Sequence, residues 1–149
     1  MGVGALIVDN DRIVLVRRRN EPAQGEWSIP GGLVKLGETL ERAVVREARE
    51  ETGLDVEPKI LVKLLERIFP DDRGRVRYHY ILADYLCSVV GGSLIAGSDA
   101  TDAVWAGRSE LNWYALPDAN MQVILSVLDR DSQRNSCHDR DSGAVSDDS

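Results

Sequence analysis

Three glutamates, Glu47, Glu50 and Glu51, are spaced three and four residues apart in a stretch with a helical pattern. At about 100° of rotation per residue, their carboxylates share one face of that helix. Like charges at this spacing destabilise a helix unless a cation lies among them. Ligand sets made only of oxygen favour Mg²⁺ or Mn²⁺, and the stretch contains no His or Cys to suggest zinc. The pattern therefore predicts a divalent metal site, with a solvated acidic helix face as the alternative.

The residues around the glutamates predict the elements that position them. Gly31 and Gly32 follow a strand end at residues 27–30, where the backbone can approach a ligand closely. Thr39 is expected to cap the start of the helix, and Gly53 fits the left-handed position after its end. The opposite helix face is apolar and consists of Leu40, Ala43, Val44 and Ala48. The stretch is thus expected to form a loop, a helix with carboxylates on one side, and a turn.

The stretch from Gly31 to Leu54 resembles the signature of the Nudix hydrolases. That pattern is Gly, five residues, Glu, seven residues, Arg-Glu, a bulky aliphatic, any residue, Glu-Glu, any residue, Gly and an aliphatic. The matching positions are Gly32, Glu38, Arg46, Glu47, Glu50, Glu51, Gly53 and Leu54. Ala48 stands at the bulky aliphatic position, which reduces packing volume and leaves the chemistry unchanged. The order of elements extends the similarity to roughly residues 2–128.

The resemblance implies which residues carry the chemistry. Glu47, Glu50 and Glu51 would bind Mg²⁺, or Mn²⁺ in its place, together with the carbonyl of Gly32. Further acids that could join the metal site are Glu38, Asp99 and Asp102. One of the glutamates, with Glu50 and Glu51 as the candidates, or the metal alone would activate water. Arg46 is implied to pair with a glutamate and hold it in place.

Four residues outside the motif are candidates for substrate binding. Arg17 and Arg19 belong to a triple arginine just before the glycine loop, where they could face a polyphosphate or remain solvated surface. Trp27 either packs in the core or lines a base pocket. Arg77 lies in the long strand pattern of residues 75–88. These four are expected to contact a small nucleotide substrate.

The substrate class follows from a narrower resemblance. Residues 27–32, 73–85 and 98–103 look similar to bacterial and archaeal ADP-ribose pyrophosphatases, and Pro70 lies at the spacing after Leu54 that is associated with that subgroup. The implied reaction converts ADP-ribose to AMP and ribose 5-phosphate. The alternatives are hydrolysis of (oxidised) nucleoside triphosphates or dinucleoside polyphosphates and, in another class, a nucleotide-binding sensor without hydrolysis. The complete glutamate set argues against the sensor.

Hydrophobic patterning predicts a mixed sheet between helices, the α/β/α sandwich that the resemblance also implies. Strands are expected at residues 2–8, 12–16, 59–69, 75–88 and 103–106, and a second helix at 117–128. One catalytic domain would occupy residues 1–131. Residues 132–149 are expected to form a disordered polar tail because apolar residues almost vanish there.

Composition limits the partners and the compartment. The chain has 149 residues, and its 18 basic and 25 acidic residues give a net charge of -7, which argues against coating a nucleic acid polymer. No run of 18 apolar residues is present to suggest a membrane span. Two cysteines give no disulfide framework, so a cytoplasmic location is expected. A homodimer is left open.

Overall fold

The computed structural model describes residues 1–21, 23–97 and 99–142. The strands are β1 (Gly2–Asp9), β2 (Arg12–Arg18), β3 (Trp27–Ser28), β4 (Gly31–Leu33), β5 (Leu54–Pro70), β6 (Val76–Gly92) and β7 (Ala100–Gly107). The helices are α1 (Leu40–Thr52), the 3-10 helix η1 (Arg108–Tyr114) and α2 (Asp118–Ser142). All five strands and both helices expected from the sequence are present, although β5, β6, β7 and α2 are longer than predicted.

The sheet is mixed, as expected. Its strand order is β3-β2-β1-β6-β5, with β4 also paired to β1 and β7 paired to β2. β1 and β6 run parallel, whereas the other pairs are antiparallel. β1 and β2 pair at Val8 with Ile13 and at Asp9 with Arg12, next to the turn that joins them. β1 therefore pairs along its length with β6, and near its start with β4.

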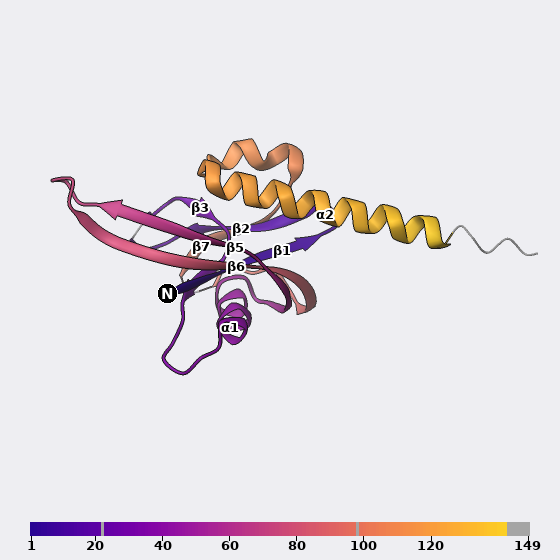
Figure 1. Cartoon of the computed structure of the whole chain (residues 1–149), viewed down its shortest axis with the longest axis horizontal. Coiled ribbons are helices and arrows are strands. Elements are labelled where there is room, and N and C mark those ends of the chain that lie inside the picture. The colour runs from indigo at the N-terminus through magenta and orange to yellow at the C-terminus, as the bar shows by residue number, and fades with distance from the viewer. Residues whose placement is uncertain (22, 98, 143–149) are drawn as a thin grey trace, which may run out of the picture.

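Two apolar cores form on the two faces of the sheet. Figure 1 shows α1 below the strands and α2 above them. Val3, Ala5 and Ile7 of β1 belong to the core under α1, while Leu6 and Val8 belong to the core under α2. This alternation follows from the two-residue period of a strand, and every residue of β1 except Asp9 is buried because both faces are covered. The sandwich architecture predicted from the sequence is confirmed.

Helix α1 has the ends that its sequence predicts. The Thr39 side chain accepts a hydrogen bond from the Arg42 amide at 3.2 Å, which satisfies one of the unpaired donors of the first turn. Gly53 has φ 72°, in the left-handed region, and donates to the Arg49 carbonyl at 3.0 Å. The apolar stripe of this helix packs on the sheet, so the glutamates are held at a fixed position relative to β4.

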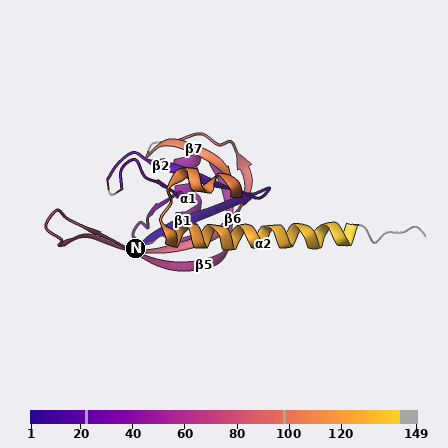
Figure 2. The ribbon, with the colours of Figure 1, turned by 90° about the horizontal axis from the view of Figure 1, so that it is seen from above.

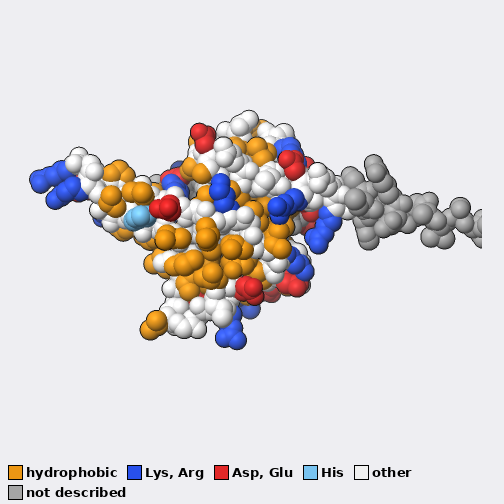
Figure 3. Space-filling view, viewed as in Figure 1, with side chains coloured by type: hydrophobic (Ala, Val, Ile, Leu, Met, Phe, Trp, Pro, Cys, Tyr) orange, Lys and Arg blue, Asp and Glu red, His pale blue; other side chains and the backbone are white. Residues whose placement is uncertain are grey.

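A long two-stranded hairpin formed by β5 and β6 projects from one end of the molecule. Its outer part extends past the other strands, as Figures 1 and 2 both show. One of its faces contributes to the cavity described below. The other is apolar and partly exposed, with Leu61 at 47%, Leu64 at 57%, Ile68 at 53% and Ile81 at 48%. Figure 3 shows hydrophobic side chains gathered over this side of the molecule.

Helix α2 extends into the segment 132–149, which is expected from the sequence to form a disordered polar tail. The helix continues to Ser142, and residues 143–149 lie outside the described part of the chain. Its last fully buried apolar residue is Leu128. Beyond that point polar contacts to the body hold the first part of the extension, because Arg108 binds Asp129 at 2.6 Å and Ser132 donates to Asp11 at 3.1 Å. A helix already nucleated and anchored can extend through polar residues without burying them.

None of the described helices is long and apolar enough to cross a membrane.

Candidate active site

Glu47 and Glu51 are buried at the junction between α1 and the glycine strand β4. The exposed fractions are 7% for Glu47 and 6% for Glu51. The Gly31 amide donates to Oε2 of Glu51 at 3.1 Å. Burial raises the pKa of Glu51 to about 8, and the neighbouring charge of Glu47 raises it further against the lowering effect of the Gly31 amide. Burial likewise raises the pKa of Glu47. Two adjacent carboxylates that resist ionisation form a place where a cation is strongly favoured.

Arg46 binds the carboxylates around it, as the sequence predicts. It forms two bonds to Glu38, from Nε to Oε2 at 2.7 Å and from Nη2 to Oε1 at 2.8 Å. Its Nη1 donates to Glu47 at 2.7 Å and to Glu50 at 3.2 Å, and its Nη2 donates to the Leu33 carbonyl at 3.0 Å. The hydrogen bonds from Arg46 lower the pKa of Glu38 to about 2. Since both oxygens of Glu38 are engaged by Arg46, its geometry fits a residue that positions Arg46.

Gly32 has no room for a side chain. A Cβ at this position would lie 2.5 Å from the Glu47 carboxylate. The absence of a side chain therefore lets the backbone of β4 lie directly against the acid cluster. This contact explains why the motif has glycine at residue 32 in physical terms.

Replacing Gly32 with Ala is expected to lower turnover at least about tenfold, because the new methyl group must displace the Glu47 carboxylate. Initial rates at saturating metal and substrate measure this effect. Gly107→Ala is the matched control, since a Cβ there would meet its nearest atom at 3.5 Å, an ordinary contact. Equal rates for Gly32→Ala and the wild type would show that the position of Glu47 is unimportant.

The loop before β7 brings one of the two predicted aspartates to the cluster. The Gly97 amide donates to the Glu51 carbonyl at 2.8 Å, which holds this loop against the end of α1. Asp99 lies close enough for its charge to raise the pKa of both Glu47 and Glu51. Asp102 instead lies on β7 opposite Arg17. Of the two candidates, Asp99 is therefore the one placed to contribute to a metal site.

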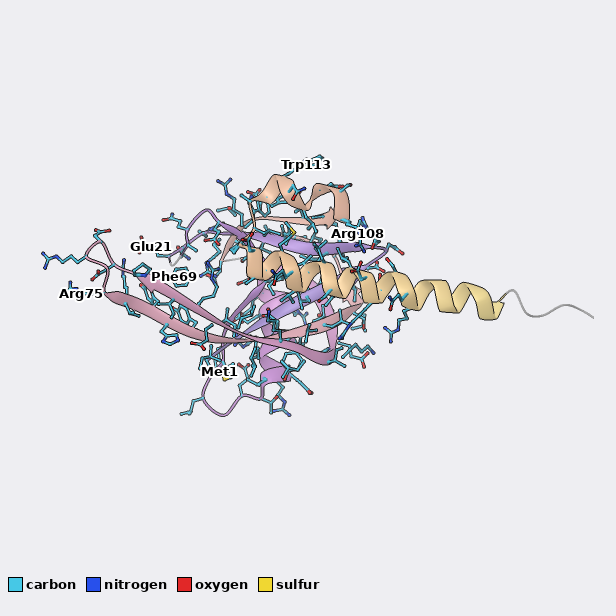
Figure 4. All side chains as sticks on the ribbon, turned by 45° about the horizontal axis from the view of Figure 1, so that its top comes forward. Met1, Glu21, Phe69, Arg75, Arg108 and Trp113 are labelled. Atoms are coloured by element: carbon cyan, nitrogen blue, oxygen red, sulfur yellow. The ribbon has the colours of Figure 1, made fainter. Side chains whose placement is uncertain are left out.

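A cavity of about 260 Å³ begins at the glycine strand and runs beneath the β5–β6 hairpin. Its polar and charged lining residues are Arg18, Glu21, Ser28, Arg67, Asp84 and Asn120. Its apolar and aromatic lining includes Val3, Ile29, Leu65, Phe69, Tyr80 and Leu82. Figure 4 shows Phe69 on the hairpin and Glu21 in the facing loop, on the same side of the molecule. Charged and apolar side chains together line this cavity, and such a mixed lining suits a ligand with phosphates and a ring.

The predicted substrate contacts do not line this cavity. The side chain of Arg17 donates to the Gly25 carbonyl at 3.1 Å, and Arg19 donates to the Ala100 carbonyl at 3.4 Å. Trp27 packs edge-to-face on Tyr114, with 4.9 Å between the ring centroids, against the core under α2. Arg77 is exposed and pairs with Glu21 at 3.4 Å. These side chains support the loop and hairpin around the cavity.

Sequence reasoning missed Arg18, Asp84 and Asn120. Arg18 is the last residue of β2, and the pairing of β2 with β7 shifts register between Arg17 and Arg18, so the strand period of the sequence does not single it out. Asp84 is a single acid in an apolar run, which is a signal for a buried polar function. Asn120 begins α2 among polar residues, and its sequence context gives no comparable signal.

The donor set fits a hard divalent cation. Within residues 1–21, 23–97 and 99–142, no three acidic, His or Cys side chains are gathered closely enough to hold a metal ion as they stand. Glu50 is turned toward Arg46, with 45% of its side chain exposed. Glu47 and Glu51 nevertheless offer adjacent buried oxygens whose ionised forms need a compensating charge. Of the three predicted metal ligands, Glu47 and Glu51 therefore form a buried pair, while Glu50 is paired with Arg46.

Comparisons with known proteins agree with this geometry. The NUDIX domain model matches residues 1–128. The ADP-ribose pyrophosphatase of Methanocaldococcus jannaschii is 41% identical over 103 residues, which make up 69% of this chain and 59% of that protein. The 8-oxo-dGTP diphosphatase of Escherichia coli is 32% identical over 128 residues, which cover 85% of this chain and 94% of that protein. The crystal structure of a MutT NUDIX hydrolase from Burkholderia pseudomallei has a TM-score of 0.71 at 30% identity, covering 83% of this chain and 93% of that chain.

Proposed function

We propose that this chain, which belongs to the NUDIX hydrolase family, cleaves the pyrophosphate bond of a nucleoside diphosphate linked to another moiety. The most specific form of the proposal is hydrolysis of ADP-ribose to AMP and ribose 5-phosphate. The observation that carries it is the buried pair Glu47 and Glu51, which lies against Gly31 and Gly32, two glycines that line the cavity. The similarity of this chain to the M. jannaschii ADP-ribose pyrophosphatase supports the choice of ADP-ribose as the substrate.

Nudix hydrolases use divalent metal ions. In this chain Glu47 and Glu51, with the Gly32 carbonyl, are proposed to hold Mg²⁺, and Glu50 and Asp99 can complete the ligand set. When bound, the ion neutralises pyrophosphate oxygens and makes a water molecule more acidic. Glu51 is the proposed general base, and Glu50 is the alternative.

The remaining charged residues position these groups. Arg46 fixes Glu38, Glu47 and Glu50 through charge-assisted hydrogen bonds, so its proposed role is in positioning and not in the chemical step. Arg18 lines the cavity and lies close enough to Glu51 to lower the pKa of that acid. It is proposed to contact the substrate phosphates in place of Arg17 and Arg19.

Turnover is expected to stop in EDTA and to return on addition of Mg²⁺, with Mn²⁺ as a substitute. Oxygen ligands of this kind bind hard cations, and the paired acids need a compensating charge. Product formation measured before and after chelation tests the requirement. Full turnover in EDTA would contradict the metal role of the glutamates.

A substrate screen decides among the candidate reactions. Purified protein with Mg²⁺ is incubated with ADP-ribose, 8-oxo-dGTP, diadenosine tetraphosphate and the ordinary nucleoside triphosphates, and the products are separated by chromatography. AMP and ribose 5-phosphate as the fastest-formed products support the proposal. Hydrolysis of 8-oxo-dGTP is the second candidate, favoured by the match that spans 94% of the E. coli enzyme. Binding of these compounds without cleavage of any would instead identify a sensor.

Three further expectations stay predictions: the cytoplasmic location, the absence of a nucleic acid partner, and the homodimer. The exposed aliphatic face of the β5–β6 hairpin is the surface to examine for the homodimer. Light scattering coupled to size-exclusion chromatography measures the oligomeric state of the purified protein directly.

A further inference from the structure

Asp84 is a buried acid that the proposed chemistry does not use. It lies in the middle of β6, is 2% exposed, and lines the cavity. Across the part of the chain that the structure describes, its carboxylate receives no hydrogen bond. Burial raises the pKa of Asp84 to about 7. The positive charge of Lys63, an exposed residue opposite Asp84 on the neighbouring strand β5, partly opposes this rise. Burying such a group without a partner is costly, so its position calls for a ligand.

The surrounding backbone makes room for this carboxylate. A Cβ on Gly4, which faces Asp84 across the β1–β6 pair, would collide with Oδ1 of Asp84 and with the end of Ile29. Gly4 also lines the cavity. The missing side chain therefore leaves room for the Asp84 carboxylate against β1, at the wall of the cavity.

Strand register places Asp84 at a useful distance from the acid cluster. Gly4 pairs with Asp84 on one side and with Gly31 on the other, so Asp84 and Gly31 are two strand spacings apart, roughly 10 Å. This separation is too large for Asp84 to share a cation with Glu51, whose carboxylate is bound to the Gly31 amide. It fits the distance from the phosphates of a nucleotide to its base. The walls near Asp84 include Leu65 and Leu82, which suit a flat ring.

We propose that Asp84 determines base specificity by accepting a hydrogen bond from the exocyclic amino group of a purine. The inference rests on the proposed function, because it assumes that the phosphates lie at Glu47 and Glu51. An amino group supplies the donor that the carboxylate lacks, and the apolar walls strengthen the bond by excluding water. Adenine and guanine both carry such a group, whereas hypoxanthine carries none.

Binding of AMP, GMP and IMP separates this inference from the proposed reaction, because no bond is cleaved. Isothermal titration calorimetry with Mg²⁺ measures the three dissociation constants for the wild type and for Asp84→Ala. The wild type is expected to bind AMP or GMP at least about tenfold more tightly than IMP, and the tighter of the two identifies the base. In Asp84→Ala this preference is expected to fall to within about twofold. A purely structural role would weaken all three ligands equally.

Two further variants keep the test decisive. Cys87→Ala removes another buried side chain of β6, on the face under α1, and should leave the preference for the amino purine unchanged. Asp84→Asn preserves size and an acceptor oxygen, and it replaces Asp84→Ala if that variant fails to fold. If the wild type prefers AMP over IMP, Asp84→Asn should retain that preference. If the wild type prefers GMP over IMP, Asp84→Asn should lose the preference, because an amide cannot accept from both N–H groups of guanine. Equal binding of all three nucleotides by the wild type, or an unchanged preference in Asp84→Ala, would overturn the proposal.

Discussion

Replacing Glu51 with Gln is expected to lower turnover by about 10² or more while raising the stability of the metal-free protein at neutral and alkaline pH. The loss of rate corresponds to a barrier increase of about 3 kcal/mol, because the variant lacks both a proposed metal ligand and the proposed base. The gain in stability arises because glutamine occupies the same volume without a charge that burial disfavours.

The pH dependence of this stability difference has a defined sign. The pKa of Glu51 rises from 4.5 to about 8 on folding, so the folded protein holds its proton more tightly than the unfolded chain. The wild type therefore loses stability as the pH rises through this interval, by an amount on the order of 5 kcal/mol. Glu51→Gln lacks this contribution. The two metal-free proteins should unfold alike near pH 4.5 and differ most above pH 8.

Thermal melts in EDTA across this pH range, together with initial rates in Mg²⁺, test the prediction. Glu41→Gln is the matched control because Glu41 is an exposed glutamate in the first turn of the same helix. Its curve should follow that of the wild type. A Glu51→Gln protein that melts well below the wild type and keeps most of its activity would assign the cluster a structural role and contradict the proposed hydrolase.

Replacing Arg46 with Ala is expected to reduce metal-free stability by about 2–4 kcal/mol. The change leaves the buried Glu47 carboxylate without its cation and removes both bonds to Glu38 and the bond to the Leu33 carbonyl. Turnover should fall as well, because the acids lose their fixed positions. Urea unfolding in EDTA measures the stability, and activity at low urea measures the rate.

Arg49→Ala provides the control for this loss. Arg49 lies on the same helix, its side chain is 75% exposed, and its ion pair to Asp55 spans 3.6 Å. Such a surface pair contributes little, so stability should change by less than about 1 kcal/mol. The stability of Arg46→Lys should lie between those of Arg46→Ala and Arg49→Ala, because an ammonium group cannot reproduce the paired bonds to Glu38. If Arg46→Ala is no less stable than Arg49→Ala, the network around Arg46 does not stabilise the fold.

The part of the site that could be predicted from the sequence is the part made by local rules. Thr39, Gly53 and the helical spacing of the glutamates depend on residues a few positions apart, and the structure reproduces those features of α1. The cavity depends on strands brought together from distant segments. Arg18 was missed because the register shift in the pairing of β2 with β7, between Arg17 and Arg18, is not visible in the sequence. Asp84 was missed because its place at the cavity wall depends on Gly4, which lies 80 residues earlier in the chain.

The parallel pairing of β1 with β6 also sets the order in which the molecule can form during synthesis. Gly2 pairs with Leu82 and Ile7 with Cys87, so the most buried strand waits for most of the chain to emerge before it meets its partner. Until then β1 and β2 form a short apolar hairpin with no complete core to cover it. Contacts of such wide sequence separation slow folding, and exposed apolar strands promote association between nascent chains. The glycine strand β4 pairs with the same segment of β1, so the candidate metal site becomes fully ordered only after β6 has emerged and paired with that segment.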